Sequence, residues 1–251
     1  MPRQTFEIGM ISGVRLGVHV SWIAVYLFVA FALSRALPML PLPESLAFGA
    51  LAALALFASV VVHEFAHALT ARRFGIRTSA ITLFLFGGVA TIDDEAPTPR
   101  AEALVALAGP AASIVLGLIA AGALLVTERL VPGRAGTALG LLSAYLAIAN
   151  GVLAAFNLVP AYPMDGGRVL RAVLWRRGGD RDAATRGAAR LGIGFAIALI
   201  AAGIALAVVA HNALYGWYAV LGGFVLRQGR AELRSAQPVV VVPNVEVERA
   251  A

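Results

Sequence analysis

The sequence predicts an all-α polytopic membrane protein with six transmembrane helices and a small re-entrant β segment between the second and third of them. Its 251 residues are 60% hydrophobic and only 14% charged, and the mean hydropathy is +0.83. Soluble domains contain roughly 45–50% apolar and about 25% charged residues, so this composition is typical of a membrane protein. The chain contains no cysteine, which excludes disulfides, zinc–thiolate sites and cysteine nucleophiles.

Six apolar runs approach the length that a membrane-spanning helix needs, which is about 20 residues. The last run is short, and its Tyr215, Trp217 and Tyr218 are typical of a membrane interface. We therefore expect a six-helix core over residues 1–227 and a short cytosolic tail over 228–251, in which residues 239–247 could form one strand. The expected spans are residues 18–37, 46–71, 101–127, 137–159, 190–210 and 213–227.

The arginines test this count of spans. The net charge is +6, and all 20 basic residues are arginine. If the N-terminus is cytosolic, seventeen arginines fall on cytosolic segments, and only Arg35, Arg129 and Arg134 fall outside. This asymmetry indicates an even number of spans with both termini in the cytosol. Because the arginines lie between apolar runs, they are better explained by membrane orientation than by binding of nucleic acid. We expect the arginines of residues 168–190 to form a loop that contacts lipid, although they could also hold acidic residues of a substrate next to its membrane segment.

Two shorter segments lie between the second and third spans. Residues 82–92 are rich in β-forming residues and too short to span as a helix. They could form a surface hairpin, or a re-entrant segment whose edge pairs with an extended substrate. The acidic residues Asp93, Asp94 and Glu95 could bind a second metal, but a solvated loop is the simpler interpretation. Thr98 and Pro99 would then begin the third span as N-cap and first helical residue.

The second span contains the pattern H-E-x-x-H. His63 and His67 are four residues apart, so on a helix they share one face and can bind one metal ion. Glu64 is placed to reach a water polarised by zinc and to take its proton. His63 lies roughly 26 Å along a span that crosses a core of about 30 Å, which places the site within the membrane, towards its cytosolic side.

Asp165 is the best candidate for a third ligand. Pro160 and Pro163 must bend or end the fourth span there, and Gly166 and Gly167 allow tight backbone. The second and fourth spans both run from outside to inside, so their C-terminal ends lie at the same membrane face. Asp165 can therefore meet the two histidines, although it could instead be a helix cap at the membrane surface.

Two motifs together closely resemble those of the site-2 protease family of intramembrane zinc metalloproteases. These are HEFAH (63–67) and N-x-x-P-x-x-P-x-D-G-G (157–167). The resemblance extends to LGVHVSW (16–22), FGGVA (86–90) and AGPAAS (108–113). It covers nearly the whole chain, but no ligand-sensing or inserted PDZ domain is present in it, so we expect a short form of the family.

The resemblance implies one zinc ion per chain and a catalytic base. It assigns the zinc to His63, His67 and Asp165, the base to Glu64, and a role near the substrate to Asn157. Backbone near Gly88 would also position the substrate. The implied function is hydrolysis of peptide bonds in or near transmembrane segments of single-pass membrane proteins, in the lipid bilayer of a prokaryotic plasma membrane. The sequence gives no oligomeric state.

Two other functions fit part of the pattern. A catalytically silent chaperone or scaffold would bind transmembrane segments without cutting them, and it would not need Glu64. A metal-ion transporter would use the histidines and Asp165 as a transit site. It would need further polar residues on a path to the outer face, and the first, third and fifth spans supply almost none.

Overall fold

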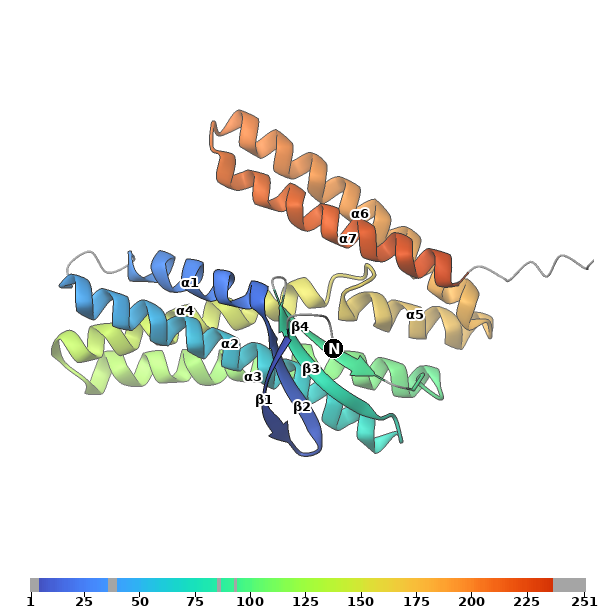
Figure 1. Cartoon of the computed structure of the whole chain (residues 1–251), viewed down its shortest axis with the longest axis horizontal. Helices are drawn as coiled ribbons and strands as arrows, with labels where there is room; N and C mark the ends of the chain where they lie inside the picture. Colours follow the sequence, from blue (N-terminus) through green and yellow to red (C-terminus); the bar gives the residue numbers. More distant parts are fainter. Residues whose placement is uncertain (1–4, 36–39, 85–86, 93, 237–251) are drawn as a thin grey trace, which may run out of the picture.

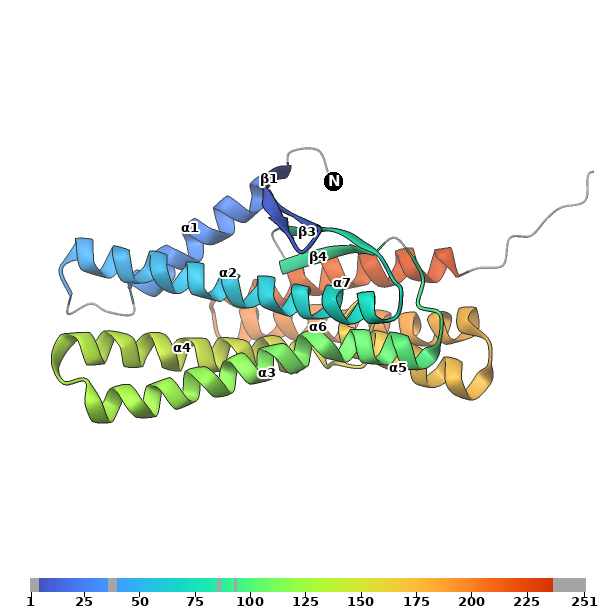
Figure 2. The same ribbon diagram turned by 90° about the horizontal axis from the view of Figure 1, so that it is seen from below.

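Most of the chain is helical, and its first four long helices lie side by side (Figures 1 and 2). The computed structural model describes residues 5–35, 40–84, 87–92 and 94–236. Glycine permits close packing in this bundle: a Cβ at Gly49 would lie 2.0 Å from the Ala30 carbonyl oxygen. Asn150 donates to the Ser59 hydroxyl at 3.1 Å, and this hydrogen bond joins two helices of the bundle. The helices are α1 (Val20–Ser34), α2 (Leu42–Arg73), α3 (Pro99–Leu130) and α4 (Gly133–Asn157).

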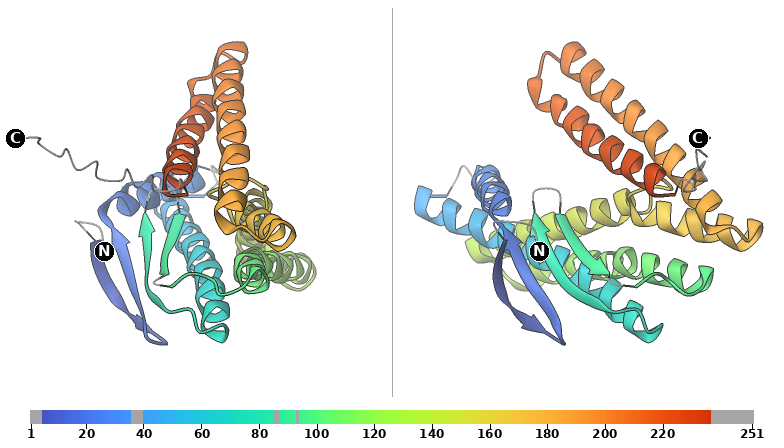
Figure 3. Two further views of the ribbon diagram at one scale, coloured as in Figure 1. Left: turned by 90° about the vertical axis from the view of Figure 1, so that its right-hand side faces the viewer. Right: turned by 45° about the vertical axis from the view of Figure 1, so that its right-hand side comes forward.

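The second half of the chain forms a helical pair that leans away from this bundle (Figure 1). Helix α5 (Asp165–Gly178) connects the two parts, because it contacts both α3 and α6. Helix α6 (Arg181–Val209) then packs along α7 (Gly216–Ser235), and the short 3₁₀ helix η1 (Ala213–Tyr215) joins them. Figure 3 shows the α6–α7 pair rising from the bundle and the β strands on the bundle's flank.

Four helices of the described residues, α2, α3, α4 and α6, are long and apolar enough to cross a membrane. The chain is therefore an integral membrane protein built mostly of helices. The other two expected spans correspond to α1, which is apolar but has only 15 residues, and to α7. The second half of α7 carries Arg227, Arg230, Glu232 and Arg234, which lowers its hydropathy.

The chain is not all-α, because a four-stranded sheet packs beside α2 (Figure 2). The strand order is β1-β2-β3-β4, with β2 and β3 parallel and the two outer pairs antiparallel. The expected β segment at residues 82–92 is present as part of β3 and β4, but the strands that precede α1 were not predicted. The strands are β1 (Thr5–Ile11), β2 (Val14–His19), β3 (Thr78–Phe84) and β4 (Gly87–Ile92).

The predicted loop at residues 168–190 is also wrong, because these residues form most of α5 and the first turns of α6. Helix α5 ends at Gly178 and is capped by Gly179, whose φ of 73° is the left-handed conformation that favours glycine. The Asp180 side chain then accepts hydrogen bonds from the backbone N–H groups of Asp182 and Ala183, and it caps α6. Two signals therefore place a tight turn between two helices here.

A buried ionic network fixes α5 against its neighbours. The Arg171 guanidinium of α5 donates to the Glu102 carboxylate of α3 and, at 3.3 Å, to the Glu232 carboxylate of α7. It also lies over the Tyr162 ring, 5.3 Å from its centroid. Arg171 and Glu102 are both buried. Because a buried charge without its partner is strongly destabilising, this network holds the start of α5 in one place.

Candidate metal centre

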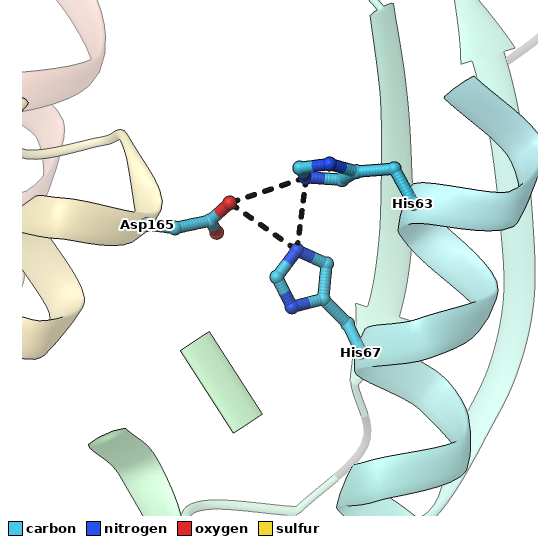
Figure 4. Close-up of side chains that lie close together, drawn as sticks. All are labelled: His63, His67 and Asp165. Atoms are coloured by element: carbon cyan, nitrogen blue, oxygen red, sulfur yellow. Dashed lines mark hydrogen bonds and ion pairs between the residues drawn. The ribbon is translucent and has the colours of Figure 1, made fainter. Parts of the chain in front are cut away.

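Three side chains from α2 and α5 converge on one point (Figure 4). His63 and His67 project from the same face of α2, and Asp165 is the first residue of α5. The Nε2 atoms of the two histidines are 3.2 Å apart. Each of them is also 3.2 Å from the Asp165 Oδ2 atom. The three ligand atoms therefore form an equilateral triangle, and the structure brings together the three residues that the sequence singled out.

This triangle fits a zinc ion. Zinc bonds of about 2.0–2.1 Å in a tetrahedron place neighbouring ligand atoms about 3.3 Å apart. The side chains of His63 and His67 are 3% and 6% exposed, and that of Asp165 is 13% exposed. Two imidazoles and one carboxylate are also the donor set of a catalytic zinc, which keeps its fourth position for water. The group could thus hold one metal ion.

Small residues after Asp165 place its carboxylate. A Cβ at Gly166 would lie 2.3 Å from the Leu158 carbonyl oxygen, and one at Gly167 would lie 2.4 Å from the Tyr162 backbone nitrogen. The first turn of α5 is therefore packed directly onto the backbone of the preceding turn. Residues with a side chain at these two positions would push α5, and Asp165 with it, away from the histidines.

Helix α3 holds the far side of both imidazole rings. His67 Nδ1 donates to the Val105 carbonyl oxygen at 2.7 Å, and His63 Nδ1 lies 2.9 Å from the Ser113 hydroxyl. Partners of this kind orient histidines that bind metals through their other nitrogen. Sequence reasoning missed both contacts. Ser113 belongs to the AGPAAS segment (108–113), but the pattern of that segment does not identify which residue meets a histidine.

Gly109 brings the α3 backbone up to the converging atoms. A Cβ at this position would lie 2.2 Å from His67 Nε2 and 2.5 Å from His63 Nε2. Helix α3 can therefore pass beside the metal-binding atoms only because residue 109 has no side chain. The Pro110 ring follows within the same helix and is itself buried.

Glu64 lies beside the triangle without belonging to it. Its side chain packs against strand β4, where a Cβ at Gly88 would lie 2.5 Å from Glu64 Cγ and 3.0 Å from its Oε1. Glu64 and Gly88, which the sequence assigned to different roles, are thus neighbours. Asn157 is the last residue of α4, and its amide donates to the Leu153 carbonyl oxygen of the same helix at 2.9 Å.

The acidic residues before α3 have arginine partners. Asp94 accepts hydrogen bonds from the backbone and guanidinium N–H groups of Arg77, and these hold the pKa of the Asp94 carboxyl below its usual value. Glu95 pairs with Arg181. Asp93 lies outside the described residues. Thr98 accepts from the backbone N–H of Ala101 and caps α3, with proline in its first turn, as predicted.

The other described histidines take no part in the group. His19 is the N-cap of α1, and its Nδ1 accepts a hydrogen bond from the Ser21 backbone. His211 lies just after α6, at the far end of that helix from its Asp180 cap. Among the described residues, the group therefore consists of His63, His67 and Asp165.

A polar cleft of about 250 Å³ shares one residue, Val105, with the surroundings of this centre. Val105, whose carbonyl binds His67, lines the cleft. Most of its other lining groups are polar or charged, which suits water. They include Glu102, Tyr162, Arg168, Arg171 and Glu232.

Known proteins are similar to this chain in sequence. The sequence model of peptidase family M50 matches residues 51–140 and 134–201. Rip3 of Mycobacterium tuberculosis, which is named as a zinc metalloprotease, is 39% identical over 92% of this chain. The protein sll0528 of Synechocystis, named in the same way, is 37% identical over 92% of the chain. The chain spans 59% and 60% of the lengths of these two relatives.

A solved structure has the same architecture. The site-2 protease from Methanocaldococcus jannaschii matches with a TM-score of 0.63 and 29% sequence identity. The match covers 92% of this chain and 95% of that structure.

Proposed function

Since this chain belongs to the site-2 protease family, peptidase family M50, we propose that it is an intramembrane zinc metalloprotease. It hydrolyses peptide bonds in or near the transmembrane segments of membrane proteins. The observation that carries this proposal is the 3.2 Å triangle of His63, His67 and Asp165 atoms, most of it buried on a helix apolar enough to span the bilayer. Ionisable residues within the bilayer cost free energy to bury, and they are usually functional.

The chemistry divides between the metal and Glu64. Zinc, when bound by His63, His67 and Asp165, supplies a Lewis acid that makes water a nucleophile at neutral pH. Glu64 takes a proton from the attacking water as its oxygen bonds to the peptide carbonyl carbon. Glu64 then gives that proton to the amide nitrogen as the carbon–nitrogen bond breaks, so that a carboxyl and an amine leave the site.

The sheet supplies a place for an extended substrate. Strand β4 is an end strand, so the edge that faces away from β3 has backbone groups that no other strand of the described sheet pairs. An edge of this kind can add a peptide as a further strand. Gly88 on β4 contacts Glu64, so a peptide along β4 would have its backbone near the catalytic base. We assign Gly88 and Asn157 to substrate positioning.

We propose that water reaches the site through the polar cleft. Val105 contributes to the cleft and to the hydrogen bonding of His67. The charged groups around it, among them Arg168 and Arg171, belong to the end of the molecule where α2 finishes in Arg72 and Arg73. An arginine-rich end of this kind is typical of the cytosolic face.

The finer topology follows from the arginine distribution. We propose six spans, with α1 and α7 completing the set given by α2, α3, α4 and α6, and with both termini in the cytosol of a prokaryotic plasma membrane. Residues 1–227 form the protease core, and residues 228–251 form the tail. Helix α7 extends eight residues into that tail, up to Ser235. The substrates are single-pass membrane proteins.

Cleavage in vesicles tests the proposed function. The full chain is reconstituted with a set of single-pass segments that carry different tags at their two ends, and the products are measured before and after removal of zinc by a chelator. We expect cleavage within or beside the segment, loss of cleavage after chelation and recovery when zinc is returned. His67→Ala is the matched inactive control. Segments that bind without being cut would support the scaffold instead, and cleavage that survives chelation would contradict the metal mechanism.

A further inference from the structure

Ser113 is a buried serine whose hydroxyl contacts a residue of the metal centre. It lies on α3, one helical turn beyond Gly109, and its exposed fraction is 0%. Its Oγ atom is 2.9 Å from Nδ1 of His63 on α2. By contrast, the hydroxyls of the buried Ser34 and Ser45 donate to carbonyl oxygens of their own helices. The Ser113 hydroxyl therefore makes a specific contact between two helices.

The position of the His63 proton follows from the geometry of the centre. Its Nε2 atom faces the other two ligand atoms, at 3.2 Å from each. A nitrogen that binds a metal carries no proton, so the single proton of the neutral ring must be on Nδ1. Nδ1 then donates, and the Ser113 oxygen is the acceptor within reach. For His67 the same argument gives a donor at Nδ1 and the Val105 carbonyl as acceptor.

We propose that Ser113 is a positioning residue that holds His63 with its proton on Nδ1 and its Nε2 lone pair towards the metal. This inference rests on the proposed function, because it assumes that the His63, His67 and Asp165 group binds zinc. Helix α3 then orients both histidines, one through the Val105 backbone and one through the Ser113 side chain. A substitution cannot remove the Val105 acceptor, because it is a backbone carbonyl, but it can remove the Ser113 hydroxyl. Ser113 is therefore the residue at which this arrangement can be tested.

Without the Ser113 hydroxyl, the His63 ring can adopt tautomers and orientations that do not bind the metal. The ring can place its proton on either nitrogen and can rotate, and only one combination presents a lone pair to the metal. Loss of partners of this kind typically weakens metal binding by about 10–100-fold. A serine that merely fills space between α2 and α3 would have no such effect, provided that its replacement also fits.

The pair Ser113→Thr and Ser113→Val separates the hydroxyl from its volume. Both variants have the same shape and add the same bulk at a fully buried position, but only threonine keeps an acceptor. Ser113→Ala is the smaller deletion. Ser45→Ala is the matched control, since it removes a buried hydroxyl whose bond is within its own helix. All variants are made in the full chain and purified in detergent. Their thermal unfolding midpoints are measured, and zinc affinities are compared among variants whose midpoints match that of the wild type.

The measurement is the dissociation constant for zinc, by competition with a chromophoric chelator, together with the visible spectrum of the cobalt-substituted protein. We expect Ser113→Ala and Ser113→Val to bind zinc about 10–100-fold more weakly than wild type. Ser113→Thr should bind several-fold more tightly than Ser113→Val, and its cobalt spectrum should match the wild type. Equal zinc affinity in the threonine and valine variants would overturn the proposal. If the wild type itself bound no zinc, the proposed function would fail instead.

Discussion

Replacing Glu64 with glutamine should nearly abolish cleavage while leaving one zinc ion on each chain. Glutamine has almost the same size and shape, so it can occupy the space between α2 and Gly88. It cannot take a proton from the attacking water. A positioned acid or base contributes about 10²–10⁴-fold to a rate, and we expect turnover to fall within this range. Turnover on a cleaved tagged segment and zinc per chain are measured on the same preparations.

Glu44→Gln is the control for this experiment. Glu44 is exposed in the first turn of the same helix, far along α2 from the metal centre. Its substitution should change neither turnover nor zinc. If Glu64→Gln kept most of its activity, Glu64 would not be the base. If it lost its zinc, Glu64 would be acting as a ligand or would be needed to form the site.

Replacing Gly109 with alanine should empty the metal site through a single methyl group. That methyl would lie 2.2 Å from His67 Nε2 and 2.5 Å from His63 Nε2. Non-bonded carbon and nitrogen atoms cannot come this close to each other. The rings cannot move away without losing their contacts to Val105 and Ser113. Either α3 shifts or the two nitrogens leave the triangle. We expect zinc per chain to fall to near zero and cleavage to be lost.

Gly122→Ala provides the comparison within the same helix. A Cβ at Gly122 would meet no atom within 4 Å, so this variant should keep its zinc and its activity. Helix content and the thermal unfolding midpoint are measured for both variants to show that the bundle has formed. A Gly109→Ala protein that holds one zinc and cleaves at the wild-type rate would show that α3 does not approach the ligands in this way.

The long apolar helices could be predicted from sequence because each one carries its own signal. The bounds of α2 and α3 need only an apolar run and local caps such as Thr98. Helix α5 could not be predicted in this way, because its arginines interrupt any apolar run. The strands before α1 carry a weaker signal, because they lie outside the apolar runs that mark the spans. Alternation at Phe6, Ile8 and Met10, which are all exposed on β1, was the available signal.

The ligand triangle could be anticipated because spacing and topology act together. The spacing of four positions from His63 to His67 places both on one face of α2, and the shared direction of α2 and α4 brings Asp165 to the same end. Their roles as ligands, and that of Glu64 as base, remain predictions. The contacts made by Val105 and Ser113 depend on which face of α3 meets α2. The face that α3 turns towards α2 is set by the packing around Gly109, and no local sequence pattern predicts that packing.

Counting zinc per chain by mass spectrometry is the most direct test of the central claim, since it needs no substrate. The purified full chain is compared with His67→Ala and Asp165→Ala, and with Asp94→Ala as a control carboxylate that pairs with Arg77 instead. We predict about one zinc in the wild type and in Asp94→Ala, and much less in the other two variants. A wild-type chain that holds no zinc even after reconstitution would contradict the proposed protease. Full zinc in Asp165→Ala alone would show that the third ligand lies elsewhere.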